Sequence, residues 1–163
     1  IVSRVIERAR LGPSGVRIEG VDDLMIRFAK CCHPLPGDHI IGFVTRGRGV
    51  SVHRTDCPNR VQFTAALDRR VPVHWHVAKD QHFLAGINIL AEDRKGLLGD
   101  ISEAISNTDT NIRSARARAV DGRASNVFVL EVENLQQLRR VMKKVKRIRG
   151  VLSVERMDEL EGV

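Results

Sequence analysis

The sequence lacks any long apolar run, and none of its segments approaches the roughly 20 residues that a membrane-spanning helix requires. Its start, IVSRVIERAR, lacks the apolar stretch and small-residue cleavage site of a secretory signal, and it also lacks an initiator methionine. We therefore expect a cytoplasmic fragment of a longer protein, with no membrane partner. Cysteine is scarce: three residues are an odd number, and cytoplasmic thiols stay reduced, so metal binding or simple burial explains them better than a disulfide.

Catalytic signatures are also missing. The sequence contains no HExxH, no nucleophile elbow and no Walker loop. His74 and His76 flank Trp75, but no glutamate lies close to them in the sequence, so a polar strand face explains the pair better than a metal hydrolase does. We expect no catalytic site in this chain.

The residues that are present are those of a folded protein, since 42% of the 163 residues are hydrophobic and 29% are charged. This length allows one ordinary domain or two small ones. The net charge of +7 is unevenly spread: residues 1–79 carry 13 Lys and Arg against 7 Asp and Glu, whereas residues 80–163 carry 14 against 13. A local basic excess is the footprint expected for a phosphate-backbone partner, although a merely basic soluble surface would look the same.

The sequence pattern changes near VAKDQH, which predicts three segments. Residues 1–16 indicate the end of an upstream helix or linker, because Val2, Val5 and Ile6 have helical spacing and a Gly-Pro pair follows. Residues 17–79 form the cysteine-containing domain, and residues 80–163 form a second domain.

The cysteine-containing domain is predicted to be a small α+β unit. GVRIEGVDDLMIRFAKCC indicates one or two short strands. IIGFVT and VSVH are apolar runs joined by RGRG, whose glycines tolerate positive φ, so we expect a β-hairpin. A helix is expected after Cys57, near Pro58 and with Val61 and Ala65 on one side, before the strand VPVHWHVA.

The second domain alternates strand and helix patterns. FLAGINILAED, NIRSARARAV, ASNVFVLEVE and VLSVERM are the expected strands, and DGR is a hairpin turn. GLLGDISEAISNT and LQQLRRVMKKVKRIRG have helical periodicity, and the second of these helices exposes a basic face and ends at Gly150 in the C-cap position. The order is βαββαβ, the ferredoxin-like arrangement, so the fold class of the chain is α+β. The residues expected on the buried sides of the helices are Leu97, Ile101, Ala104, Ile105, Leu135, Leu138, Val141, Met142, Val145 and Ile148.

All three cysteines lie in the segment KCCHPLPGDHIIGFVTRGRGVSVHRTDC. Thiolate and imidazole ligands select zinc, and Cys31, Cys32, His53 and Cys57 supply the four ligands of a closed structural site. Adjacent cysteines match a zinc knuckle poorly, because successive side chains on extended backbone point apart. His33 could replace a cysteine, Asp56 could add an oxygen, and three buried thiols without metal remain an alternative.

The same segment resembles the conserved-cysteine or zinc-finger domain of the bacterial RelA/SpoT family, whose long enzymes make and degrade the alarmone (p)ppGpp. The paired cysteines, the PLPGD loop, the GFVTRGRGVSVHR hairpin and the final DC carry the resemblance. AEDRKGLLGDISEAIS is similar to the entry of the ACT domain that follows in that family. The resemblance implies bound zinc and a non-catalytic regulatory region whose partners are the upstream catalytic domains of the same chain and the ribosome.

Ribosomal RNA is the nucleic acid that the resemblance implies for the cysteine domain. Basic side chains surround the cysteines, and guanidinium groups suit phosphate oxygens. Because aromatic residues make up only 4% of the sequence, we expect contacts with the RNA backbone and its shape rather than base stacking. The residues expected to bind RNA are Lys30, Arg46, Arg48, Arg54 and Arg60.

A small amino acid is the ligand that the resemblance implies for the ACT half, commonly bound across a homodimer where the first strand turns into the first helix. At that turn Gly96 allows close backbone approach, and the helix start can receive a carboxylate. An apolar lining favours valine or isoleucine. Alternatively, Leu97 is ordinary core and Asp93 caps the helix. A module that binds an amino acid or dimerises without contacting RNA is the alternative function. The expected ligand-binding residues are Asp93, Arg94, Lys95, Gly96, Leu97, Leu98, Asn111 and Ile112.

Overall fold

The structure is a computed structural model that describes residues 15–18, 25–47, 49–61 and 67–160. The chain divides into two compact units, Ile1–Gln81 and His82–Val163. This division lies two residues from the boundary expected at 79/80. None of the described helices is long and apolar enough to span a membrane. The helix expected within residues 1–16 falls almost wholly on residues 1–14, outside the described residues.

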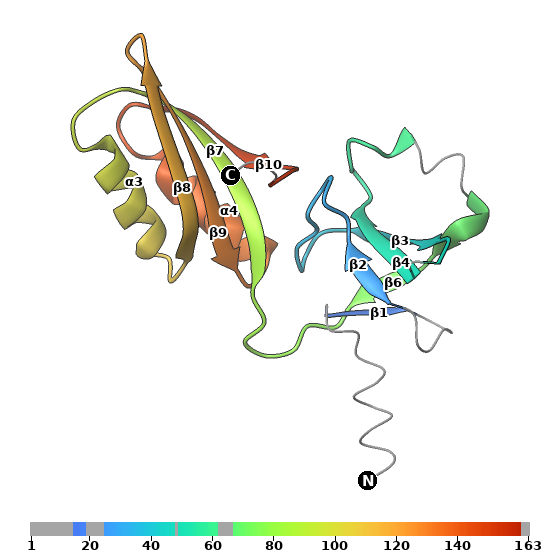
Figure 1. The fold of residues 1–163 in the computed structure, drawn as a ribbon. Coiled ribbons are helices and arrows are strands. Elements are labelled where there is room, and N and C mark those ends of the chain that lie inside the picture. The colour runs from blue at the N-terminus through green and yellow to red at the C-terminus, as the bar shows by residue number, and fades with distance from the viewer. Residues whose placement is uncertain (1–14, 19–24, 48, 62–66, 161–163) are drawn as a thin grey trace. The chain divides into compact units, whose positions relative to one another are not determined.

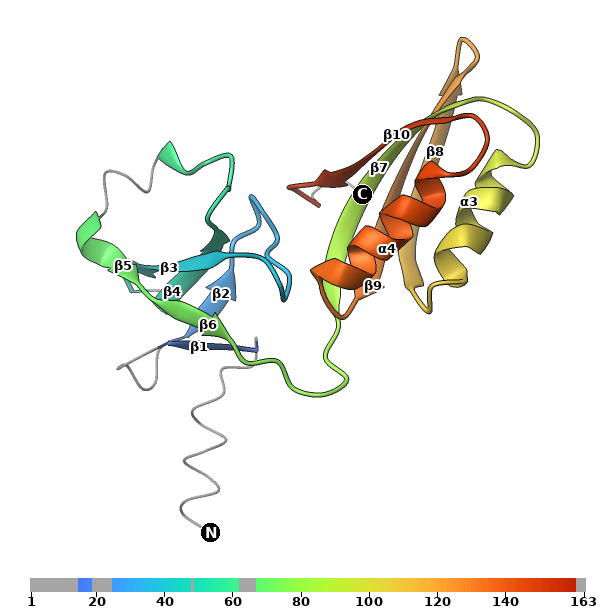
Figure 2. The ribbon, with the colours of Figure 1, turned by 180° about the vertical axis from the view of Figure 1, so that it is seen from behind.

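A four-stranded sheet in the order β2-β4-β3-β5 forms most of the first unit (Figures 1 and 2). The expected hairpin is present as β3, Ile40–Thr45, and β4, Gly49–Arg54, which pair antiparallel. Its turn contains Gly47 at φ 71° and leads into β4 through Gly49 at φ 81°, left-handed values that glycine adopts without a Cβ clash. The short strand β2, Ile26–Phe28, runs parallel to β4, and β5, Arg70–Val71, pairs with β3.

A second, two-stranded sheet pairs β1, Val16–Ile18, with β6, Val73–Trp75. The two sheets share one apolar cluster, in which the buried side chains are Val16, Ile18, Val50, Val52 and Val73. The Trp75 indole donates a hydrogen bond of 2.9 Å to the carbonyl of Asp38, which ties the PLPGD loop to β6. The helix expected after Cys57 falls largely on residues 62–66, outside the described residues, and Leu67–Arg69 form a 3-10 turn.

The second unit is a four-stranded antiparallel sheet with two helices on one face (Figures 1 and 2). Its strand order is β10-β7-β9-β8, and the chain order of these elements confirms the predicted βαββαβ arrangement. The elements are β7, Phe83–Glu92; α3, Leu97–Ser106; β8, Asn111–Val120; β9, Arg123–Val132; α4, Leu135–Lys146; and β10, Val151–Met157.

The helices bury the sides that their periodicity predicted. Leu97, Ile101 and Ile105 of α3 are buried, as are Leu138 and other apolar residues of α4. Ala104, Leu135, Met142 and Ile148 are only partly buried. The expected end of the second helix is wrong: α4 ends at Lys146 with Arg147 as its C-cap, and Gly150, at φ 89°, lies in the turn to β10.

Gln137 is a buried polar residue that the apolar pattern did not mark. Its amide nitrogen donates to the hydroxyl of Thr110 at 3.1 Å and to the carbonyl of Asp109 at 3.3 Å, while its amide oxygen accepts from the backbone of Glu133. These bonds tie the start of α4 to the loop after α3, so the burial of this polar side chain is matched by hydrogen bonds.

Candidate metal site and ligand pocket

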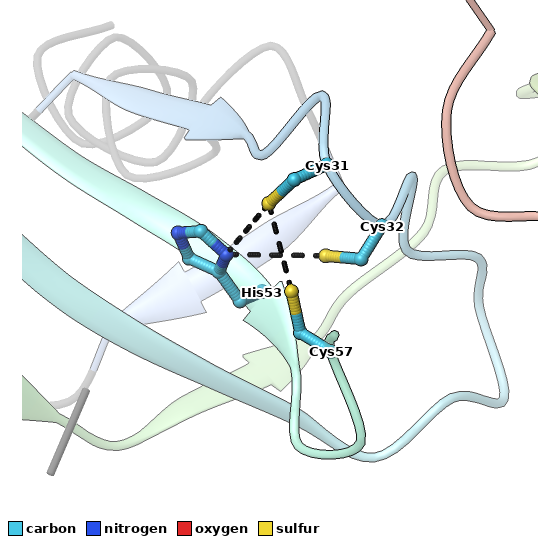
Figure 3. Close-up of side chains that lie close together, drawn as sticks. All are labelled: Cys31, Cys32, His53 and Cys57. Atoms are coloured by element: carbon cyan, nitrogen blue, oxygen red, sulfur yellow. Dashed lines mark hydrogen bonds between the residues drawn. The ribbon is translucent and has the colours of Figure 1, made fainter. Parts of the chain in front are cut away.

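Four side chains of the first unit meet at one point: Cys31, Cys32, His53 and Cys57 (Figure 3). Cys31 and Cys32 come from the turn after β2, His53 from β4, and Cys57 from the turn after β4. The two adjacent cysteines do not lie on extended backbone, because the amides of Cys32 and His33 both donate to the carbonyl of Ala29. The turn removes the geometric objection to a vicinal pair, and Figure 3 shows both sulfur atoms directed toward the His53 ring.

The distances within this cluster fit a tetrahedral metal site. Cys31 Sγ lies 3.5 Å from His53 Nδ1 and 3.5 Å from Cys57 Sγ, and Cys32 Sγ lies 3.9 Å from His53 Nδ1. All four ligand atoms lie within 4.8 Å of one another. Zinc–sulfur bonds near 2.3 Å would separate the sulfur atoms of a tetrahedron by about 3.8 Å. The cluster can therefore hold a metal ion with little movement of its ligands.

Burial sets the ionisation of these ligands. It raises the pKa of the Cys32 thiol well above its usual range. A hydrogen bond from the backbone of Arg54 lowers this pKa in part, and the neighbouring thiols of Cys57 and Cys31 raise it further. Burial also raises the pKa of Cys57 and lowers that of His53. Without a metal, the two thiols hold their protons and the imidazole is neutral at pH 7. A divalent cation would reverse this preference for the neutral thiols, because a metal ligand must be a thiolate.

Arg54 supports the cluster from behind. Its backbone amide donates to Cys32 Sγ at 3.4 Å, and its guanidinium donates to the carbonyl of Cys32 at 3.3 Å and to the carboxylate of Asp56 at 2.8 Å. The Arg54 side chain is only 9% exposed. Its expected role as a phosphate contact is therefore corrected: this guanidinium is buried against the cysteine turn. Asp56 pairs with Arg54 and belongs, like His33, outside the four-ligand group.

The remaining residues expected to bind RNA divide into two groups. Lys30, Arg46 and Arg60 are exposed, beside the cysteine turn, in the β3–β4 turn and after Cys57 respectively. Arg48 lies outside the described residues. Ser51 was not expected to contribute, yet its hydroxyl lies 3.0 Å from His53 Nε2 and orients the ring so that Nδ1 faces the cysteines.

A pocket of about 310 Å³ in the second unit lies at the turn from β7 into α3. Five of the expected ligand-binding residues line it: Asp93, Arg94, Gly96, Leu97 and Leu98. Lys95 is exposed but does not line it. Asp93 does not cap α3, because Gly96 is the N-cap residue, at φ 80° and without a side-chain hydrogen bond. The start of the helix therefore faces the pocket uncapped.

Asn126 of β9 is the pocket residue that the sequence did not indicate. It is 2% exposed, and its amide nitrogen has no hydrogen-bond partner among the described residues. An unsatisfied buried donor is rare, because its desolvation is not compensated. Ala117, Ala119 and Ala124 complete this wall, and their small side chains leave room for a ligand. Only the pairing of β8 with β9 brings these residues to the helix start.

Asn111 and Ile112 do not reach this pocket within one chain, which corrects part of the expected site. They lie at the far end of β8, opposite Glu131 and Leu130, and the Asn111 amide donates to the Glu131 carboxylate at 2.8 Å. The pocket uses the other end of the strand, near Ala119, which at about 3.3 Å per residue is roughly 25 Å away.

Comparison with known proteins places both units in described domain families. Residues 16–76 match the RelA/SpoT RIS domain, and residues 79–156 match an ACT domain. The chain is 43% identical over 162 residues to a GTP pyrophosphokinase from Myxococcus xanthus, covering 96% of this chain and 21% of that protein. It is 38% identical over 144 residues to the bifunctional (p)ppGpp synthase/hydrolase RelA of Mycobacterium tuberculosis, covering 88% of this chain and 20% of that protein.

The chain belongs to the RelA/SpoT family. Within this family it is the C-terminal regulatory region, composed of a RIS domain and an ACT domain. The chain spans about a fifth of the length of the curated relatives it matches. The crystal structure of the ACT domain from a GTP pyrophosphokinase of Chlorobium tepidum is also similar, with 39% identity and a TM-score of 0.44, covering 47% of this chain and 100% of that chain.

Proposed function

We propose that this region is the cytoplasmic regulatory module of a stringent-response (p)ppGpp synthetase/hydrolase. In this proposal the RIS domain is held by zinc and contacts ribosomal RNA, the ACT domain binds a branched-chain amino acid, and both control catalytic domains elsewhere in the parent protein. The convergence of Cys31, Cys32, His53 and Cys57 carries the proposal, because a closed four-ligand cluster would fix a small hairpin domain of limited core.

Exposed cations of the RIS domain support contact with RNA. Lys30 lies next to Cys31 and Arg60 lies three residues after Cys57, whereas Arg46 lies in the β3–β4 turn, at the other end of β4 from His53. Each phosphate contact that such a cation makes releases counterions, so binding weakens with salt by a slope close to the number of contacts. The salt dependence therefore counts the phosphate contacts and does not merely detect binding.

The double substitution Arg46→Ala with Arg60→Ala should weaken ribosome binding and flatten its dependence on salt concentration by about two units of log–log slope. Pelleting of the full chain with ribosomes over a salt series measures this slope. Arg116→Ala with Arg123→Ala is the matched control, since it removes two exposed cations from the ACT domain. An unchanged slope for the first pair would contradict RNA contact through these turns.

The pocket beside α3 supports the binding of an amino acid. The uncapped helix start and the unpartnered Asn126 amide offer donors to a carboxylate, Asp93 offers an acceptor to an ammonium group, and Leu97 and Leu98 offer apolar contact. Leu97 is 4% exposed, so it also belongs to the core, as the alternative interpretation expected.

A homodimer would bring the two separated parts of the expected site together. β8 is an edge strand with ten residues, and its outer backbone groups are a template for a further strand. Antiparallel pairing of two copies of β8 would lay Asn111 and Ile112 of one copy beside the pocket end of the other. The geometry of one chain, which leaves Asn111 far from the pocket, thus favours a ligand site shared between two chains.

Complementation between two variants tests this shared site. Gly96→Trp fills one pocket, since the glycine faces open space, and Asn111→Ala removes the residue contributed to the other copy. Each variant alone should fail to bind valine in calorimetric titration, whereas an equal mixture should regain about a quarter of the sites through mixed dimers. Binding by Asn111→Ala alone would show a pocket complete within one chain. Silence of the unmodified chain with all aliphatic amino acids would contradict amino-acid binding altogether.

A further inference from the structure

A second, larger groove of about 560 Å³ lies between α3 and α4 of the ACT domain, apart from the proposed amino-acid pocket except for Arg94, which lines both. Four cations line the groove, and they come from three places: Arg94 before α3, Lys144 and Arg147 at the end of α4, and Arg149 in the turn to β10. Two carboxylates, Asp100 and Glu103 of α3, also line it. The lining therefore has a net positive charge.

The charges inside the groove are only partly compensated. Arg94 and Asp100 neutralise each other across 2.6 Å, and Lys144 donates to the carbonyl of Asn107 at 3.1 Å. Within the described ranges, the side chains of Arg147 and Arg149 form no ion pair or hydrogen bond. Arg147 and Arg149 therefore line the groove without an ion-pair partner in the described part of the chain, and each guanidinium can hold a phosphate through two parallel hydrogen bonds.

The groove is also held in place before any ligand binds. The Arg94 guanidinium donates two hydrogen bonds to the carbonyl of Arg149, each 3.2 Å long. These bonds hold the backbone of Arg149 close to the start of α3. Ala104 and Ile148 add apolar surface between the charged groups. The groove is open to solvent and its lining is mostly polar, which suits a ligand held mainly through its phosphates.

We propose that this groove binds a nucleoside diphosphate or a closely related phosphate ester. Arg147, Arg149 and Lys144 hold the phosphates, and Ala104 and Ile148 contact the base. The Glu103 carboxylate, which has no ion pair with any residue that the structure describes, accepts a hydrogen bond from the base or ribose. The groove would bind a phosphate ester, whereas the pocket beside α3 is proposed to bind valine. Arg94 connects the two, since it lines both and bonds to the backbone of Arg149.

Calorimetric titration of the full chain with guanosine diphosphate and adenosine diphosphate tests the proposal. Saturable binding at one site per chain is expected for at least one nucleotide, and Arg147→Ala with Arg149→Ala should weaken it by at least about tenfold, because each lost hydrogen bond to a charged group costs at least that factor. Arg139→Ala with Lys143→Ala is the matched control: these exposed residues of α4 lie outside the groove, and the control should change the affinity less than about twofold.

Three results would overturn the proposal. The first is no saturable heat with either nucleotide. The second is an equal loss of affinity in both double variants, which would indicate general attraction to a basic helix rather than a site. The third is binding of an RNA oligonucleotide but of neither nucleotide, with both pairs contributing alike, which would assign the basic side of α4 to RNA. Thermal unfolding of both double variants shows whether each remains folded.

Discussion

At the scale of single residues, burial separates side chains that look alike in the sequence. Arg46, Arg54 and Arg60 all lie near the cysteines in the sequence, yet only Arg54 turns inward, to the cysteine turn and Asp56. The sequence supplied the four candidate metal ligands from residue type and number, and the structure brings these four together. The burial of Arg54 and of Asn126 could not be predicted from the sequence, since strand pairing and turns decide which side chains face inward.

Metal content is the first residue-scale prediction. If zinc occupies the cluster, protein purified without chelator should contain about one zinc per chain, and Cys57→Ala should remove it, because three ligands no longer close the site. Elemental analysis measures both. Cys57→Ala that keeps its zinc would contradict the ligand assignment, and a metal-free parent chain of equal stability would favour buried thiols. Asp56→Ala, whose carboxylate lies outside the four-ligand group, is the control and should keep the metal.

The pH dependence of zinc affinity follows from the same residues. The raised pKa values of Cys32 and Cys57 mean that both thiols are protonated in the metal-free chain at pH 7, while the lowered pKa of His53 leaves its imidazole free of the extra proton. Zinc must displace the two thiol protons, so affinity should rise with pH, by about two orders of magnitude per unit from these thiols alone. Competition titrations with a zinc indicator at several values above about pH 7, where the imidazole is uncharged, measure this slope. A flat profile would contradict thiolate ligation.

At the scale of elements, periodicity predicted the ACT half well, because β7, β9 and both helices have one apolar side over ten residues or more. The end of α4 was predicted less well. A C-cap at Gly150 would end the helix at Arg149, but α4 ends three residues earlier, at Lys146, and Gly150 belongs to the turn into β10. The RIS half was harder to read, since strands of two to six residues carry little periodicity and their order depends on contacts distant in sequence.

Strand β3 offers a stability prediction at this scale. A Cβ at Gly42 would lie 2.7 Å from Val73, 2.8 Å from Val71 and 2.9 Å from Val50 side-chain atoms, so all three valines would have to move. Gly42→Ala should therefore destabilise the RIS domain by about 1–3 kcal/mol, the usual cost of overpacking a core. Chemical denaturation followed by Trp75 fluorescence reports this domain, which holds the only Trp. Unchanged stability would contradict the tight packing of β3 against these valines.

At the scale of the whole molecule, two units of different chemistry follow each other in one chain. The basic excess lies in the first, which also holds the four-ligand cluster, while the second contains the pocket beside α3 and the groove between α3 and α4. Since each unit has its own core, loss of the metal from one should leave ligand binding by the other intact.

We propose that a metal-held RIS domain gives this region its contact with the ribosome. The most direct test is ribosome pelleting of the full chain and of Cys57→Ala at the same low salt concentration, with valine binding measured on both. We expect Cys57→Ala to lose ribosome binding together with its zinc, while its titration with valine is unchanged. Equal pelleting of the zinc-free variant and the parent chain would contradict the claim.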